Sequence, residues 1–159
     1  MAYHAGQLLK ASDLGQATTC AEYNATANQT ITTATDTILA FGTTNTTSTL
    51  VTRAVDGVGH NFTLNREGIW AITAQCRYTS SGTGERFFAI TLNGTTSRVA
   101  VEGGEAGSQA LSASLCIVRA FSATDIIRVM TFHNKGSNAD TAGSNVDGYG
   151  RINLCWLGG

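Results

Sequence analysis

The stretch NREGIWAITAQCRYTS, residues 65–80, decides the fold class. It opens with the turn-forming Asn-Arg-Glu-Gly and continues into residues that favour β-strands. Because successive side chains of a strand point to opposite faces of its sheet, the stretch divides into two sets. One face carries Trp70, Ile72, Ala74, Cys76 and Tyr78, and the other carries Ile69, Ala71, Thr73, Gln75 and Arg77. The first is a core face, while the second is half apolar and nearly uncharged, which is unusual for a surface in water.

Short strands separated by turns account for most of the remaining chain. Asp56-Gly57 and Asn93-Gly94 are typical of β-hairpin turns, and no ten-residue segment has a convincing helical period. The expected strands are residues 30–41, 49–55, 60–64, 68–79, 85–93, 96–102, 110–121, 125–134 and 148–157. This spacing predicts an all-β protein, a jelly-roll β-sandwich of about eight to nine antiparallel strands.

The composition limits the partners that the protein can have. Of the 159 residues, 13% are charged and the net charge is −1, where soluble domains carry about 25% charged residues. No basic surface is therefore expected for nucleic acid or for an anionic membrane. No apolar run is long enough for a signal peptide or a membrane span, so we expect no membrane insertion. A net charge near zero suits a protein that assembles with copies of itself.

The first 28 residues differ from the rest of the chain. Leu8, Leu9 and Leu14 have no strand pattern that would place them in the sandwich, and Tyr3 adds a large contact side chain. A segment this short cannot bury three leucines alone, so it must pack on its own assembly or on a partner. We therefore divide the chain into a short non-globular N-terminal arm that serves as an anchor, residues 1–28, and a jelly-roll trimerisation domain, residues 29–159.

The four cysteines are widely spaced, at positions 20, 76, 116 and 155. There is no C-x-x-C pair, and three of the four lie inside apolar strands. The pattern favours buried free thiols over a zinc site or a disulfide framework, with Cys76 and Cys116 as small apolar core residues. It also favours a reducing compartment, at least during folding.

No motif in the sequence indicates catalysis. His4, His60 and His133 lie far apart, so we expect no metal site, and nothing predicts a cofactor. The acidic residues stand mostly beside glycines in turns and form no pair that resembles a glycosidase dyad. The phosphate-binding and hydrolase motifs are absent, and we predict that the protein is not an enzyme.

Three segments resemble the trimeric jelly-roll superfamily of tumour necrosis factor and the complement globular heads. The first is Phe62 followed by Gly68-Ile69-Trp70, which resembles the family's Phe…Gly-x-Tyr segment. The second is DIIRV, residues 125–129, where Thr124 replaces the family's usual Gly. The third is the closing strand, residues 148–157 (GYGRINLCWL). The likeness covers about residues 30–159.

The resemblance implies a homotrimer, in which one sheet of each subunit packs against its neighbours around a threefold axis. The half-apolar face of residues 69–77 would then be an interface, and the alternative is an ordinary half-exposed sheet face. We expect aromatic residues from the long strands at the trimer axis, and the candidates are Tyr78, Phe87, Phe121 and Tyr149.

Features beyond the jelly roll indicate the kind of trimer. The sequence shows no collagen stalk and no secretory signal, and it looks like a bacteriophage virion component made in the bacterial cytoplasm. The expected role is a surface knob that decorates or stabilises the capsid, with the major capsid protein or another virion protein as the partner of the arm. The alternative is a tail-fibre or baseplate tip that binds a host-surface receptor or glycan. A glycan-cleaving tail enzyme is disfavoured by the missing carboxylate pair.

Overall fold

The computed structural model describes residues 19–79, 83–105, 111–143 and 150–159. These residues form thirteen strands and no α-helix, so no helix in this part of the chain could cross a membrane. The strands are β1 (Thr19–Asn24), β2 (Gln29–Ile31), β3 (Thr37–Ile38), β4 (Thr43–Thr46), β5 (Val51–Asp56), β6 (Gly59–Leu64), β7 (Gly68–Arg77), β8 (Glu85–Leu92), β9 (Arg98–Glu105), β10 (Ser112–Phe121), β11 (Ile126–His133), β12 (Ala139–Thr141) and β13 (Arg151–Gly158).

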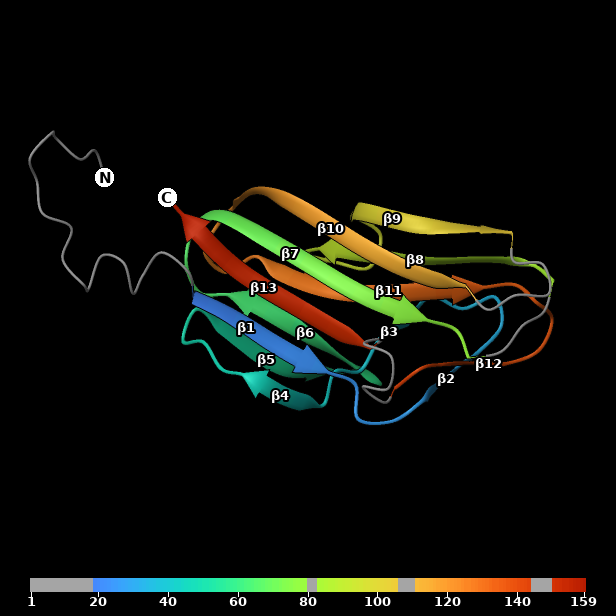
Figure 1. The fold of residues 1–159 in the computed structure, drawn as a ribbon. Coiled ribbons are helices and arrows are strands. Elements are labelled where there is room, and N and C mark those ends of the chain that lie inside the picture. Colours follow the sequence, from blue (N-terminus) through green and yellow to red (C-terminus); the bar gives the residue numbers. More distant parts are fainter. Residues whose placement is uncertain (1–18, 80–82, 106–110, 144–149) are drawn as a thin grey trace, which may run out of the picture.

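Two antiparallel sheets pack face to face (Figure 1). One sheet has the order β10-β7-β13-β1-β4, and the other has the order β5-β6-β11-β8-β9, with β3 added to β11. A small third pair, β12-β2, lies beside them. Strands that are neighbours in a sheet are often distant in the sequence, which is typical of Greek-key sandwiches. The predicted all-β sandwich is confirmed.

The deciding stretch forms β7, the strand between β10 and β13 in the first sheet. Its predicted core face is confirmed, because Trp70, Ile72 and Tyr78 are fully buried. They pack against inward side chains of the other sheet, such as Phe88 and Ile127. Burying a large apolar side chain contributes about 1.5–3 kcal/mol, so this alternating row is a main source of stability.

Gly68 marks the point where β7 begins. Its φ is +132°, and a Cβ placed there would lie 2.5 Å from the carbonyl oxygen of Gly158. A side chain is excluded for both reasons, and the close approach lets Trp156 donate its indole N–H to the Glu67 carbonyl over 3.0 Å. The turn at the start of the quoted stretch therefore closes one end of the first sheet.

Some predicted strand boundaries were wrong. Residues 30–41 do not form one strand but are divided into β2 and β3 by a turn in which Ala34 has φ +56°. Three strands were not predicted at all, namely β1, β4 and β12. All four residues of β4 are exposed threonines or asparagine, so its sequence has no apolar alternation to reveal it.

The boundary of the N-terminal arm also needs correction. Residues 19–24 form β1, which pairs with β13 and β4 inside the first sheet. Ala21 and Tyr23 point into the core, where the Tyr23 ring lies 4.9 Å from the Phe62 ring. The sandwich thus includes residues 19–24 and does not begin after residue 28. The predicted anchor residues Tyr3, Leu8, Leu9 and Leu14 lie outside the described residues.

The cysteine prediction was correct for only one residue. Cys76 is a buried free thiol, as expected, whereas Cys116 is free but exposed. Cys20 and Cys155 form a disulfide, because β1 and β13 place them directly opposite each other. The disulfide removes the argument for a reducing compartment that rested on four free thiols.

Candidate self-association face

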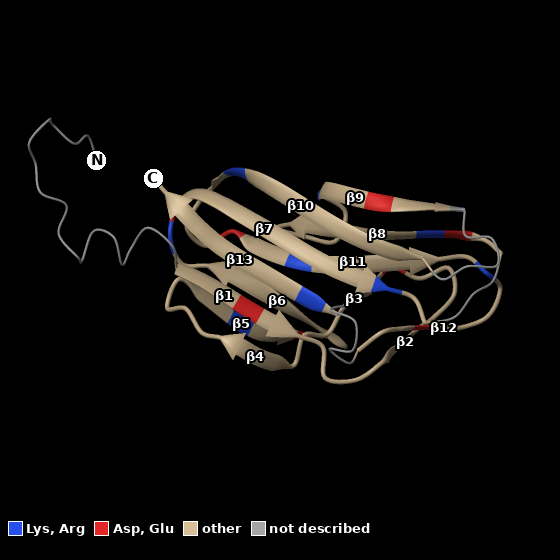
Figure 2. Cartoon of the chain, in the orientation of Figure 1, with Lys and Arg blue, Asp and Glu red and all other residues tan. Residues whose placement is uncertain are grey.

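The outer face of the first sheet carries few charged residues and several apolar ones, which is unusual for a surface in contact with water. On β7 it presents the predicted set, from the exposed Ile69 through the half-buried Ala71 and Thr73 to Gln75. The neighbouring strands extend this face, which we call the outer face of the β7 sheet. Figure 2 shows few charged residues along β7, β10 and β13.

One end of this face is apolar. Ala71 lies opposite Val118 on one side and Cys155 on the other, and Cys155 continues the row through its disulfide to Cys20. The larger side chains around this row are exposed: Ile69 by 40%, Val118 by 57% and Leu157 by 49%. Exposed apolar side chains are ordinary when scattered, but a contiguous group indicates a contact surface.

The other end of the face is polar. Asn153 donates a hydrogen bond to the Thr73 hydroxyl over 3.2 Å, and Arg151 lies 3.8 Å from the Glu22 carboxylate. Both groups of this ion pair are about one-third exposed. The face therefore has an apolar region and a polar rim, which is the arrangement that protein interfaces share.

The free thiol of Cys116 lies on the same face. It is opposite Thr73, one row away from the Val118–Ala71 pair, and it is exposed in the single chain. Cys76 faces the core instead, and burial raises the pKa of its thiol to about 12. The thiol of Cys116 is therefore accessible to reagents in the single chain, whereas the thiol of Cys76 is not.

Three of the four aromatic residues predicted for the trimer axis are described, and these three lie in different parts of the sandwich. Tyr78 is fully buried, and its hydroxyl lies 2.7 Å from the Thr131 hydroxyl. Phe121 is only 5% exposed. Phe87 is half-buried on the other sheet, where its ring stacks on Phe132 at 5.4 Å. Tyr149 lies outside the described residues. Trimer contacts by these four residues stay a prediction, and the outer face of the β7 sheet supplies better-exposed candidates.

Sequence reasoning missed Val118, Leu157 and Cys155 as members of this face. The signal was partly present, since residues 112–121 alternate and place Cys116, Val118 and Ala120 together. Both faces of that strand are largely apolar, however, so the alternation did not identify which face is exposed. The register with β7 was needed to place them beside Ile69 and Ala71.

The histidines, cysteines and carboxylates of the described residues are the side chains that could hold a metal ion together. No three His, Cys, Asp or Glu side chains lie close enough to hold a metal ion in the part of the chain that the structure describes. His60 accepts a hydrogen bond at Nδ1 from the Phe41 backbone N–H over 3.0 Å. Burial and the nearby Arg53 lower the pKa of this imidazole. Its contacts serve to hold the chain between β3 and β4.

Comparisons with known proteins agree with this architecture. No family model and no curated protein matches the sequence. The structure of Eiger TNF from S. frugiperda is similar with a TM-score of 0.59 at 9% identity, covering 88% of this chain and 92% of that one. The crystal structure of murine APRIL at pH 8.5 is similar with a TM-score of 0.58 at 12% identity, covering 88% and 99%. The chain therefore has the jelly-roll fold of these TNF-like proteins.

Proposed function

We propose that this chain is a non-enzymatic structural protein of a bacteriophage virion. It forms a homotrimeric surface knob that decorates or stabilises the capsid. Its N-terminal arm attaches the knob to the major capsid protein or to another virion protein. The protein is made in the cytoplasm of the host bacterium and resides in the virion.

The apolar end of the outer face of the β7 sheet is the observation that carries the trimer. Ile69, Val118 and Leu157 expose 40–57% of their surface around a row of small residues. Copies of the same chain are the natural cover, since a net charge of −1 sets up little repulsion between them. The superfamily resemblance supports the same oligomer, because its members pack one sheet of each subunit around a threefold axis.

The position of Thr19 supports the attachment through the arm. The first described strand begins there, opposite Trp156 in β13, at the apolar end of the same sheet. In a threefold assembly, three copies of the chain would enter their sheets at one end of the knob. Three weak contacts on a repeating particle surface then act together, which raises the effective affinity by about 10²–10⁴ when the spacing matches.

The oligomeric state tests the proposal. Light scattering on the purified protein should give about three times the 16.6 kDa mass of the chain. Val118→Asp should yield folded monomers, because it leaves the core unchanged but buries an unpaired charge in the interface. Val55→Asp is the matched control, since Val55 is 75% exposed on the opposite sheet and should leave the trimer intact. A wild-type monomer at micromolar concentration would overturn the proposal.

Cys116 supplies a second readout of the same face, which measures the accessibility of a thiol and not the mass of the oligomer. A maleimide should label it rapidly in Val118→Asp monomers and slowly in the wild-type trimer, because the assembled face excludes the reagent. Equal labelling rates would show that this face is open in the oligomer.

The alternative function is a tail-fibre or baseplate tip that binds a host receptor or glycan. An open groove lined by residues from 26–40 and by residues 56–58, with two carboxylates and several threonine hydroxyls in its walls, is the observation that favours it.

A further inference from the structure

An open groove of about 800 Å³ lies between the segment from Thr26 to Ala40 and the β5–β6 turn, and it shares no lining residue with the outer face of the β7 sheet. Its walls are residues 26–40 on one side and the turn 56–58 on the other, with Thr95 from the β8–β9 connection. The volume is in the range of ligand sites, about 300–1,000 Å³. Because the groove is open, it is better suited to one unit of an extended polymeric ligand than to a small molecule that must be enclosed.

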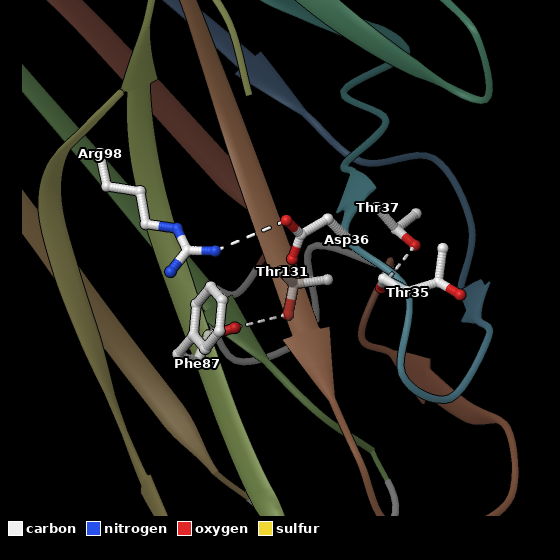
Figure 3. A network of polar contacts seen from close by, with 6 residues as sticks. All are labelled: Thr35, Asp36, Thr37, Phe87, Arg98 and Thr131. Carbon is white, nitrogen blue, oxygen red and sulfur yellow. Dashed lines mark hydrogen bonds and ion pairs between the residues drawn. The ribbon is translucent and has the colours of Figure 1, made fainter. Parts of the chain in front are cut away.

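Two carboxylates face the groove, and each is held by an arginine of the sheet behind it. Asp36 pairs with Arg98 at 3.5 Å through Oδ2, and Arg98 in turn lies over the Phe87 ring at 4.3 Å (Figure 3). Asp56 accepts a hydrogen bond from Arg128 Nε over 2.5 Å, also through Oδ2. In both residues Oδ1 has no partner among the described residues, so each carboxylate has an oriented acceptor to offer.

Two unsatisfied polar atoms lie in the sheet beside the ion pair of Asp56 and Arg128. Arg128 sits directly opposite Thr91 in the sheet. The Nη1 of Arg128 and the Oγ1 of Thr91 are both buried and have no hydrogen-bond partner in the described part of the chain. Buried polar atoms in this condition normally bind a water molecule or a ligand hydroxyl. Arg128 and Thr91 are not among the residues that line the groove, so these atoms mark a place for an ordered water molecule behind Asp56 and not a ligand contact.

The chemistry of the walls selects the class of ligand. The groove is lined by two carboxylates and, among the described residues, by no lysine or arginine, so its lining offers an anionic ligand no cation to bind. The other lining groups include threonine hydroxyls and the amides of Asn28 and Gln29, together with apolar surface from the exposed Val58, the half-buried Ile38 and two alanines. A ligand that donates hydroxyls to carboxylates and rests C–H groups on apolar side chains fits this lining.

We propose that the groove between residues 26–40 and 56–58 binds a neutral saccharide, with Asp36 and Asp56 accepting its hydroxyl groups. Arg98 and Arg128 are positioning residues that fix the two carboxylates. The inference names a site and a ligand class for the alternative function above, and it does not depend on where the trimer sits on the particle.

The test is a titration of the ¹⁵N-labelled full-length protein, followed by amide chemical shifts. The neutral probes are maltohexaose, tri-N-acetylchitotriose, lactose and mannobiose. The comparison probes are sialyllactose, inorganic phosphate and calcium chloride. We expect at least one neutral probe to shift amides of residues 26–40, 56–58 and Thr95, and the anionic probes to leave them unchanged.

Two groove variants and one control make the result specific. Asp36→Asn should weaken binding about tenfold, because hydrogen bonds to a charged acceptor are roughly twice as strong as neutral ones. Val58→Arg should abolish binding by filling the groove, and it should fold normally because Val58 is 73% exposed. Glu85→Gln removes the same charge from an exposed site outside the groove and should bind like wild type.

Three outcomes would overturn the proposal. The first is that no neutral probe shifts the groove amides, and the second is that Val58→Arg binds as well as wild type. The third is that calcium chloride alone reproduces the shifts, which would make the two carboxylates a cation site. None of these outcomes changes the light-scattering mass, so a failed saccharide site and a failed trimer are distinguishable.

Discussion

Thr124 holds a backbone conformation that few residues of its type adopt. Its φ is +73°, and it is exposed in the turn between β10 and β11. The turn is fixed around it, since its N–H donates to the Leu64 carbonyl over 2.7 Å and Ser122 donates its N–H to Asp125 Oδ2 over 2.9 Å. In the motif that residues 125–129 resemble, the residue at this position is glycine, and a threonine here adopts a locally unfavourable conformation.

We predict that Thr124→Gly stabilises the protein by about 1 kcal/mol. Glycine removes the steric cost of a left-handed β-branched residue, about 1–2 kcal/mol, and loses part of that gain to chain entropy. The midpoint of urea unfolding measures the change. Ala123→Gly is the control, because the neighbouring Ala123 is also exposed and has an ordinary negative φ, and it should destabilise. Equal effects of the two changes would contradict the explanation.

Asp56 gives the stability a dependence on pH. The hydrogen bond from Arg128 lowers the pKa of this carboxyl below its ordinary value of 3.8. Because the pKa is lowered in the folded state, the ionised Asp56 contributes its full share to the free energy of unfolding above the ordinary pKa. This share is lost as the pH falls through the folded-state pKa. The relevant interval therefore lies below about pH 4.

We predict that Asp56→Asn costs about 1 kcal/mol at pH 7 and much less near pH 2. The side chain is 28% exposed, so solvent screens part of the interaction. Urea midpoints of wild type and variant at the two pH values measure the difference. Asp36→Asn removes a more exposed pair and serves as the control, with a smaller loss at pH 7. A difference for Asp56→Asn that does not shrink at low pH would contradict the linkage.

Strands with alternating apolar residues are predictable from the sequence, and strands without them are not. β7 and β11 were found because every second residue is buried, as in Trp70, Ile72 and Ala74. β4 was missed because it is entirely exposed. The strand β1 is short and was assigned to the arm, although Ala21 and Tyr23 alternate correctly with Glu22. Its partner β13 is the last strand of the chain, and a pairing at that distance has no local signal.

The disulfide between β1 and β13 also depends on the pairing of two strands that are far apart in the sequence. Cys20 and Cys155 are separated by 135 residues, and only the register of the two strands places them opposite each other. Sequence spacing therefore could not reveal the pair. Cross-linking such a long loop reduces the conformational freedom of the unfolded chain, which in the chain-entropy account stabilises the folded state.

We predict that the double variant Cys20→Ser/Cys155→Ser is less stable by about 2–4 kcal/mol. A reductant should lower the unfolding midpoint of wild type to that of the variant and should leave the variant unchanged. Thiol counting on unreduced, denatured wild type should find two free thiols, Cys76 and Cys116, of the four cysteines in the sequence. Four free thiols before reduction would show that the cross-link is absent.

At the scale of the whole molecule, the sequence indicated the candidate face but not its extent. The outward residues of β7 were identified from alternation alone, and the structure confirms that Ile69 and Gln75 face away from the core. The apolar end also needs Val118 and Leu157, which come from strands far away in the sequence. The groove between residues 26–40 and 56–58 was not predicted at all, because its walls are threonine-rich turns and very short strands that have no periodic pattern.

The last prediction concerns the division between arm and knob. Since β1 supplies Tyr23 to the core and Cys20 to the disulfide, the arm that can be removed is residues 1–18 and not residues 1–28. Leu8, Leu9 and Leu14 belong to this segment. Their burial requires a partner surface, and deleting the arm does not alter that surface on the particle.

Deleting residues 1–18 should leave a folded trimer of correspondingly lower mass that no longer joins the particle. The measurement mixes the truncated protein with particles that lack it and compares the pelleted fraction with that of the full chain. A full-length variant with Leu8, Leu9 and Leu14 changed to Ser is the matched control for the loss of apolar contacts, and it should also remain in the supernatant. Because three arms act together, attachment should fall much more than the affinity of one arm would suggest. If the truncated trimer still pellets at full occupancy, the jelly roll itself makes the attachment and the arm has another role.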